Sequence, residues 1–290
     1  MHNKKDIDNI VYDVLRRSKA LDVFPTPVDH IVQFCELNLG DSDYFHKIPT
    51  NYLAKNLDVF NRMLNKVFGV LDREIKHIYI DPKLPAVKRM FLKLHETGHH
   101  CLPWQKHVCY FDNELTLTQE VQEDFEAEAN FFASSALFQL DRFDADIKTL
   151  PLEIGSPMAL AKKFGASNHA AIRRYAEQSK KRCALLVLEK KESNGEILTL
   201  RNNFQSASFT SSFGNITFPN ILGKEFPFVV DYSRGRKFHK DGSILIETED
   251  ESCNFTYHYF FNGHNVFVLI IPVGEKNKSR TEIHIVSQNG

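Results

Sequence analysis

The chain has 290 residues, of which 42% are hydrophobic and 25% are charged, which excludes a disordered or low-complexity protein and allows a sizeable core. The formal net charge of −1 argues against a protein that binds nucleic acid or a membrane surface over its whole area. The longest apolar run, Val266–Val273, is too short to cross a bilayer, and the N-terminus has no signal-peptide core. We therefore predict a cytoplasmic protein with no membrane partner.

The number and spacing of the cysteines indicate whether disulfides are expected. The chain has an odd number of scattered cysteines and no CxxC pair, which argues against a disulfide framework and suits a reducing compartment. We expect most of them to be small buried hydrophobic side chains. They are Cys35, Cys101, Cys109, Cys183 and Cys253.

The first eighty residues are predicted to be mainly helical. An amphipathic helix is expected within residues 1–24, and a further amphipathic pattern covers residues 52–68. Between them, Thr26 is a helix cap and Pro27 the first helical residue of another helix. The β-branched alternation of Ile75–Ile80 predicts a strand, which we expect to offer an edge for a substrate peptide.

Two strong helices follow this strand. Pro85 opens the first, which runs from Ala86 to about Leu102, and Pro103 ends it. The second runs from Thr118 to about Leu140 and has acidic first turns, which suit the positive end of the helix dipole.

The segment His95-Glu96-Thr97-Gly98-His99 lies within the first strong helix. Residues four apart project from one helix face, so His95 and His99 can bind one cation. Glu96 can take a proton from a water whose pKa zinc lowers towards about 7. This spacing is the motif of helical zinc peptidases.

A third ligand is expected from the second strong helix, because a catalytic zinc has three protein ligands and an open position. Glu126 is the favoured residue, and Asn130, one turn later, could hydrogen-bond a ligand imidazole. Glu123 and Glu128 are rival ligands, for which a solvated helix face is the favoured interpretation. Imidazole and carboxylate ligands would also accept Mn²⁺ in place of Zn²⁺.

These motifs, His95–His99 followed by Glu126-Ala-Glu-Ala-Asn-Phe-Phe-Ala, resemble the ImmA/IrrE family of metallopeptidases over roughly residues 20–180. The resemblance implies a helical zincin core with a short mixed sheet, zinc on His95, His99 and Glu126, and Glu96 as base. It also implies a bacterial or phage origin and, as substrate, a helix-turn-helix repressor cleaved under stress or for a mobile element. The chain departs from the family at His100–Trp104, which changes the expected substrate cleft but removes no ligand.

The loop after the first motif should provide a donor for the charge on the tetrahedral oxygen. Tyr110 is the preferred candidate, with His107 and His100 as alternatives. His100 itself is expected to point away from the metal, about 100° around the helix from His99. A closed structural zinc site that includes Cys101, His107 and Cys109 is a competing interpretation.

A basic segment follows. Met158–Tyr175 resembles a helix-turn-helix in which Gly165 turns the chain, and Ala159–Arg182 has seven basic residues against one acidic residue. This is a candidate phosphate footprint, so DNA is a candidate partner. The candidate contacts are Lys162, Lys163, Arg173 and Arg174.

From Cys183 onward the sequence is rich in strands and turns. We therefore predict an α+β protein with three parts. Residues 1–145 form a zincin-like metallopeptidase domain, 146–182 a helix-turn-helix-like segment, and 183–290 a β-rich domain that senses a ligand or binds a partner. The predicted function is a zinc endopeptidase, and the alternative is a non-proteolytic DNA-binding or toxin–antitoxin-type regulator that keeps the zincin fold.

Overall fold

The computed structural model describes residues 4–40, 69–72, 76–105, 119–190, 197–248 and 251–275. The helix predicted over 52–68 and the candidates His107, Cys109 and Tyr110 lie outside these residues. The chain forms two compact units, one of residues 1–143 with 162–167 and the other of residues 144–161 with 168–290. No helix in the described part of the chain has the length and apolar character that a membrane span requires.

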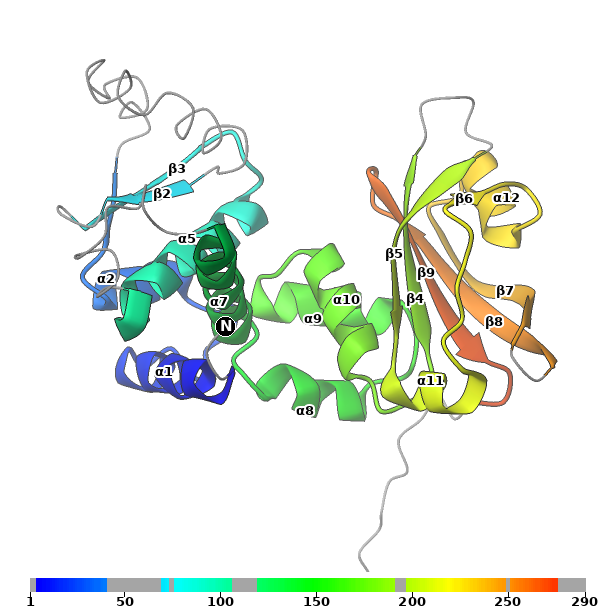
Figure 1. Ribbon diagram of the computed structural model, residues 1–290, viewed down its shortest axis with the longest axis horizontal. Helices are drawn as coiled ribbons and strands as arrows, with labels where there is room; N and C mark the ends of the chain where they lie inside the picture. Colours follow the sequence, from blue (N-terminus) through cyan, green and yellow to red (C-terminus); the bar gives the residue numbers. More distant parts are fainter. Residues whose placement is uncertain are drawn as a thin grey trace, which may run out of the picture. The chain divides into compact units, whose positions relative to one another are not determined.

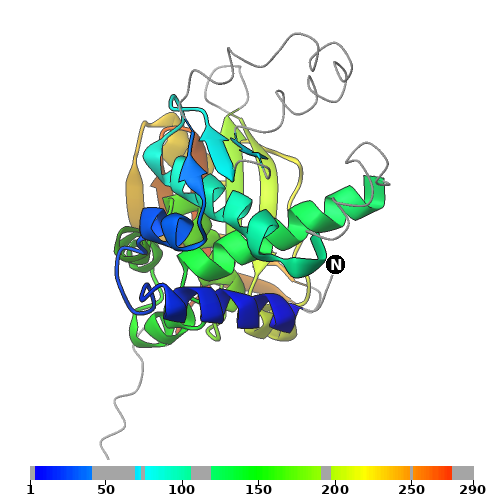
Figure 2. The ribbon, with the colours of Figure 1, turned by 90° about the vertical axis from the view of Figure 1, so that its left-hand side faces the viewer.

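The first unit combines helices with a small sheet (Figure 1). Its strands have the order β1-β3-β2, with β1 parallel and β2 antiparallel to β3. Helix α5 contacts α2, α7 and the strands β2 and β3, and α1 lies alongside α7 (Figure 2). The elements are α1 (Lys4–Arg17), α2 (Val28–Phe34), β1 (Asn38–Leu39), β2 (Gly69–Asp72), β3 (His77–Ile80), α5 (Ala86–Cys101) and α7 (Gln119–Leu137).

The strand predicted at Ile75–Ile80 is present as β3, but its expected role as an exposed edge is wrong. Strand β3 is paired on both sides, so its backbone groups already bond to β1 and β2. Among the described strands of this sheet, β1 and β2 form the edges. A peptide that added a strand here would have to pair with one of those two.

The start of α2 also differs from the prediction. Pro27 is the cap residue itself, and no side chain caps the helix. The hydroxyl of Thr26 instead donates to the carbonyl of Leu137 at 2.8 Å and accepts from Nε2 of Gln139 at 3.2 Å. Thr26 is therefore a buried link between the start of α2 and the end of α7, a tertiary role that no local capping pattern shows.

The second unit contains a six-stranded antiparallel sheet with the order β6-β5-β4-β9-β8-β7. Helix α10 packs against β4 and β5 (Figure 1). The strands are β4 (Ala184–Lys190), β5 (Leu198–Gln205), β6 (Ile221–Leu222), β7 (Phe238–Glu247), β8 (Ser252–Phe261) and β9 (Asn265–Pro272). The helices that lie wholly or partly in this unit are α8 (Arg142–Thr149), α9 (Gly155–Phe164), α10 (Asn168–Gln178), α11 (Ala207–Phe213) and α12 (Pro227–Ser233).

The sheet of the second unit is buried on both faces, which explains the continuous apolar runs of β4 and β9. Alternate residues of one face, such as Leu186 and Val268, pack with Phe209 of α11 and Phe228 of α12. On the other face, the Phe267 ring lies 5.4 Å from the ring of His169 in α10. The β-rich region and the predicted α+β class are thus confirmed.

Candidate metal centre

Two histidines of α5 meet at one point. His95 and His99 lie one turn apart, and their Nε2 atoms are 3.1 Å from each other. Both side chains are largely buried, at 10% and 13% exposure. Because residues i and i+4 share a helix face, the local fold of α5 alone brings these two nitrogens together.

Helix α7 supplies a carboxylate to the same point. The Oε2 atom of Glu126 lies 3.3 Å from Nε2 of His95, and its Oε1 atom lies 3.4 Å from Nε2 of His99. The Glu126 side chain is 57% exposed, so this side of the group is open to solvent. Among the described residues, these three form the one cluster of His, Cys, Asp or Glu with the spacing of metal ligands.

The spacing fits a tetrahedral ion. Three donors held at about 2.05 Å from one ion at tetrahedral angles stand about 3.3 Å apart. The two Nε2 atoms are 3.1 Å apart, and each lies 3.3 or 3.4 Å from a carboxylate oxygen of Glu126, Oε2 for His95 and Oε1 for His99. Two imidazole lone pairs and a carboxylate at this range repel one another unless a cation is shared among them. The group therefore could hold a metal ion.

Second partners fix the orientation of both rings. Nδ1 of His95 lies 3.1 Å from Oδ1 of Asn130, and Nδ1 of His99 lies 2.7 Å from Oε1 of Gln105. An amide oxygen only accepts, so each Nδ1 carries the proton and donates it. Each Nε2 then presents its lone pair to the shared point, which is the tautomer that a metal ligand needs.

Gln105 belongs to a buried polar network that the sequence did not indicate. Its side chain is fully buried, and its Nε2 atom donates to Oε2 of Glu128 at 2.9 Å. The indole Nε1 of Trp104 donates to the same oxygen at 2.7 Å. The chain of contacts therefore runs from Glu128 through Gln105 to His99. No spacing rule marks a glutamine six residues after a ligand, so only the fold identifies it.

The expectation that Glu128 faces solvent is wrong. This residue is 1% exposed, whereas Glu123, on the same helix, is exposed. Hydrogen bonds from Trp104 and Gln105 offset the cost of burying the Glu128 carboxylate. Through its bond with Gln105, Glu128 helps to orient His99. The carboxylate that lies with the two histidines at the spacing of metal ligands is that of Glu126.

Glu96 lies beside the two histidines in sequence and is also buried, with 5% of its surface exposed. Its negative charge acts on the ring of His99 and contributes to the raised pKa of that group. The neighbouring Gly98 permits close approach of α7, because a Cβ placed there would lie 3.1 Å from Cβ of Phe132. The glycine of the motif thus lets the helix that carries Glu126 come near α5.

In the absence of a metal ion, a proton on Nε2 can take its place, and the pKa values of His99 and Glu126 are then coupled. Burial lowers the pKa of His99, but the hydrogen bond to Glu126 and the charges of Glu96 and Glu126 outweigh it, so this pKa is raised. Burial raises the pKa of Glu126, but its hydrogen bonds with His95 and His99 outweigh it, so this pKa is lowered. Each group therefore favours the charged form of the other.

This coupling predicts a pH window of stability in protein stripped of metal by a chelator. The contribution of His99 is complete below its ordinary pKa of 6.5 and is lost as pH rises through the raised value. The contribution of Glu126 is complete above its ordinary pKa of 4.5 and is lost as pH falls through the lowered value. The difference in Tm between stripped wild type and Glu126→Gln should be largest between these two pH values. A difference that does not vary with pH would contradict the coupling.

The basic residues of the helix-turn-helix-like segment lie in both units. Lys162 and Lys163 belong to the first unit, where Nζ of Lys163 lies 4.5 Å from the ring centroid of Phe24. In the second unit, Arg173 bonds to Glu177 at 3.0 Å, and Nε of Arg174 lies 3.6 Å from Asp144. Both arginines are thus engaged within the chain, and DNA contact by the four residues stays a prediction.

Comparisons with known proteins agree with this architecture. Residues 32–175 match a peptidase family described as the IrrE N-terminal-like domain. This segment contains both motif helices, and the match confirms the resemblance to the ImmA/IrrE family that the sequence motifs predict.

A solved structure described as a Mycobacterium tuberculosis transcriptional regulator is similar in fold, with a TM-score of 0.54 at 12% identity. The alignment covers 92% of this chain and 75% of that one. At this identity the likeness concerns the fold alone. No curated protein matches the chain.

Proposed function

We propose that this protein is a zinc-dependent endopeptidase in which His95, His99 and Glu126 hold the metal and Glu96 is the general base. The observation that carries the proposal is the meeting of two Nε2 atoms and a carboxylate at 3.1–3.4 Å. Structural zinc sites are usually closed by four ligands rich in cysteine. Here the described cluster has three ligands without cysteine and an exposed side, which suits catalysis.

Each residue then has a defined task. Zinc, when bound, supplies a Lewis acid that makes water a better nucleophile at neutral pH. Glu96 takes the proton of the attacking water and passes it to the leaving amine. Asn130 and Gln105 keep the imidazoles in the required tautomer through the bonds at their Nδ1 atoms. Tyr110 remains the proposed donor to the tetrahedral oxygen.

The proposed substrate is a protein partner, namely a helix-turn-helix repressor, cleaved in a stress response or in the control of a mobile element. The match of residues 32–175 to the IrrE N-terminal-like domain supports this choice, because cleavage of such repressors is what the sequence resemblance implies. Within the proposal, residues 1–145 carry the peptidase, residues 146–182 form the helix-turn-helix-like segment, and residues 183–290 bind a signal or partner.

Metal content tests the proposal directly. Purified wild type should contain about one zinc per chain, and His95→Ala and Glu126→Ala should each lose it, because three ligands are needed to retain the ion. Glu123→Ala is the matched control, since Glu123 is an exposed glutamate of the same helix. Zinc and manganese are both measured after dialysis against equal concentrations. A wild type that binds neither ion would overturn the proposal, as would full retention in both ligand variants.

A regulator that keeps the fold without proteolysis is the alternative. The excess of basic residues in Ala159–Arg182 favours it, whereas the contacts of Arg173 and Arg174 within the chain weaken it. Salt-dependent DNA binding that survives Glu96→Gln and falls in an Arg173→Ala, Arg174→Ala variant would support this alternative.

A further inference from the structure

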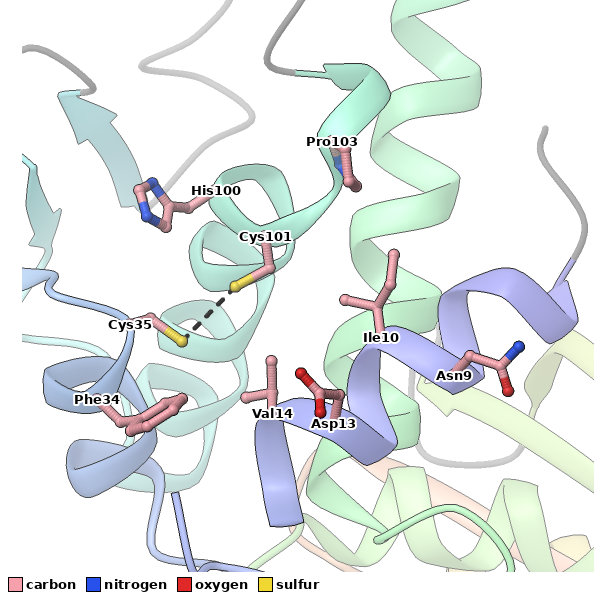
Figure 3. Close-up of a pocket in the computed structure, with 9 residues that line it drawn as sticks. All are labelled: Asn9, Ile10, Asp13, Val14, Phe34, Cys35, His100, Cys101 and Pro103. Carbon is pink, nitrogen blue, oxygen red and sulfur yellow. Dashed lines mark hydrogen bonds between the residues drawn. The ribbon is translucent and has the colours of Figure 1, made fainter. Parts of the chain in front are cut away.

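A pair of cysteines, distant in sequence, meets near the end of the helix that carries both histidines. Cys35 caps the C-terminus of α2, and Cys101 is the last residue of α5. Their sulfur atoms are 3.6 Å apart, as Figure 3 shows. This proximity is a product of tertiary packing, because 66 positions separate the two residues in the chain.

The backbone around both sulfurs is well fixed. Helix α2 packs on α5, and Nζ of Lys93 bonds to Asp29 at 2.6 Å between the same two helices. The backbone N–H of Cys35 donates to the carbonyl of Ile31 at 3.0 Å. A disulfide needs an S–S distance of about 2.05 Å. The observed separation of 3.6 Å is a non-bonded contact, so the sulfurs must move closer for the bond to form.

Small solutes can reach this pair. Cys35 and Cys101 are each partly exposed, and both line an open pocket of about 440 Å³. His100, Phe34 and Ile10 are among the other lining residues (Figure 3). The expectation that most cysteines are buried is wrong, because three of the four described cysteines are only partly buried.

The other described cysteines lack these features. Cys183 is fully buried, and burial raises the pKa of its thiol to about 11, which makes it unreactive. Cys253 lies near Glu251, at 3.7 Å from its carboxylate, and burial and that carboxylate both raise its pKa. Among the described residues, neither has a second sulfur beside it.

Metal binding is not the favoured use of the pair. Among the described residues, no further His, Cys, Asp or Glu joins the two sulfurs at ligand spacing. A soft divalent ion would need two more such ligands. Two partly exposed thiols in contact instead form the arrangement of an oxidisable cysteine with its resolving partner.

We propose that Cys35 and Cys101 are a redox modification site, which forms a reversible disulfide in the presence of a peroxide. One thiol sulfur attacks the peroxide, the O–O bond breaks, and a sulfenic acid and one water (or alcohol) result. The second thiol displaces hydroxide from the sulfenic sulfur, so the S–S bond forms and a water leaves with the remaining thiol proton. Two thiols are oxidised, one peroxide is reduced, and an external dithiol reverses the change.

The disulfide would join the end of α5, two residues after His99, to the end of α2. It would close a loop that includes the whole small sheet of the first unit and all of α5. Such a link raises stability by restricting the unfolded chain. The proposal does not depend on metal binding or on peptidase activity.

The test uses the full chain, reduced and then freed of reductant. Hydrogen peroxide is added in small excess, the remaining thiols are blocked with N-ethylmaleimide, and a non-reducing digest is analysed by mass spectrometry. Wild type should lose two of its five thiols and yield one linked peptide pair containing Cys35 and Cys101. Dithiothreitol should restore both thiols, and the oxidised protein should melt several degrees above the reduced protein.

Matched variants complete the design. Cys253→Ser, which removes a partly exposed cysteine of the second unit, should keep the link, whereas Cys35→Ser and Cys101→Ser should each abolish it together with the shift in Tm. Wild-type protein that retains both thiols under peroxide would overturn the proposal. Separate overoxidation of Cys35 and Cys101, or links that pair either one with a different cysteine, would overturn it as well.

Discussion

Replacing Glu96 with glutamine should strongly slow peptide hydrolysis and leave about one metal ion bound per chain. The expected loss in rate is about 10²–10⁴-fold, the usual contribution of a positioned general base. Glutamine keeps the size and polarity of the side chain but cannot accept the proton of the attacking water. Since His95, His99 and Glu126 form the cluster with ligand spacing, the metal should stay.

The structure provides a second readout for this substitution. Glu96 is buried within α5, and its charge contributes to the raised pKa of His99. Glu96→Gln should therefore lower the proton affinity of His99 in stripped protein, which NMR titration of the imidazole can follow. This second readout reports whether Glu96 is near His99 even where no substrate is known.

Cleavage is measured with a library of proteome-derived peptides and read by mass spectrometry, with zinc content determined on the same preparations. Glu123→Gln, which makes the same change at an exposed site of α7, is the control and should behave as wild type. Glu96→Gln protein that cleaves at the wild-type rate would refute Glu96 as the base. Loss of the metal in Glu96→Gln would show instead that this residue supports the ligands.

The second large effect is expected at Glu128. Glu128→Ala should lower the free energy of unfolding by about 2–4 kcal/mol, because it removes two hydrogen bonds to a buried charged group. The indole N–H of Trp104 and the amide of Gln105 both lose their acceptor. Gln105 also donates to the carbonyl of Phe125 at 3.2 Å, so it keeps one partner.

Metal binding should weaken in the same variant. Gln105 orients His99 through the 2.7 Å contact at Nδ1, and Glu128 in turn orients Gln105. Loss of such a supporting partner typically lowers metal affinity about 10–100-fold. The affinity is measured by competition with a chromophoric chelator, and stability by urea unfolding with and without zinc.

Two control variants distinguish loss of the Glu128 hydrogen bonds from loss of a negative charge. Glu128→Gln keeps one acceptor oxygen and the volume, so it should lose less stability and less affinity than Glu128→Ala. Glu123→Ala removes a negative charge from an exposed site of the same helix and should change stability by no more than about 0.5 kcal/mol. Wild-type stability and affinity in Glu128→Ala would show that the buried network does not support His99.

Local patterns in the sequence identified the helices that carry the site. Spacing of four along α5 places His95 and His99 on one face whatever the rest of the chain does, because helix geometry is local. The acidic start and apolar stripe of α7 marked that helix in the same way, and its Glu-Ala-Glu-Ala-Asn motif identified the family. Continuous apolar runs also indicated the β-rich part, since strands buried on both faces carry few polar residues.

Other features depend on which elements come together. The alternation of Ile75–Ile80 predicted a strand but not its place, and β3 is central because β1 and β2 pair with it from distant positions. Thr26 lies before a helix, but its hydroxyl bonds to Leu137 from α7. Both the place of β3 in its sheet and the hydrogen-bond partner of Thr26 depend on residues far along the chain, so no local sequence pattern could predict them.

The acidic helix α7 shows most clearly what the sequence determines and what tertiary packing decides. Its sequence offers Glu123, Glu126 and Glu128 within two turns, and helix periodicity favours Glu126 but leaves the other two as rival ligands. Tertiary packing at Gly98 and Phe132 sets the approach of the two helices, brings Glu126 to the histidines and buries Glu128 against Trp104 and Gln105. The sequence thus determined the chemistry that the site can perform. Packing decided which carboxylate meets the histidines and which supports them, because that choice depends on contacts between helices.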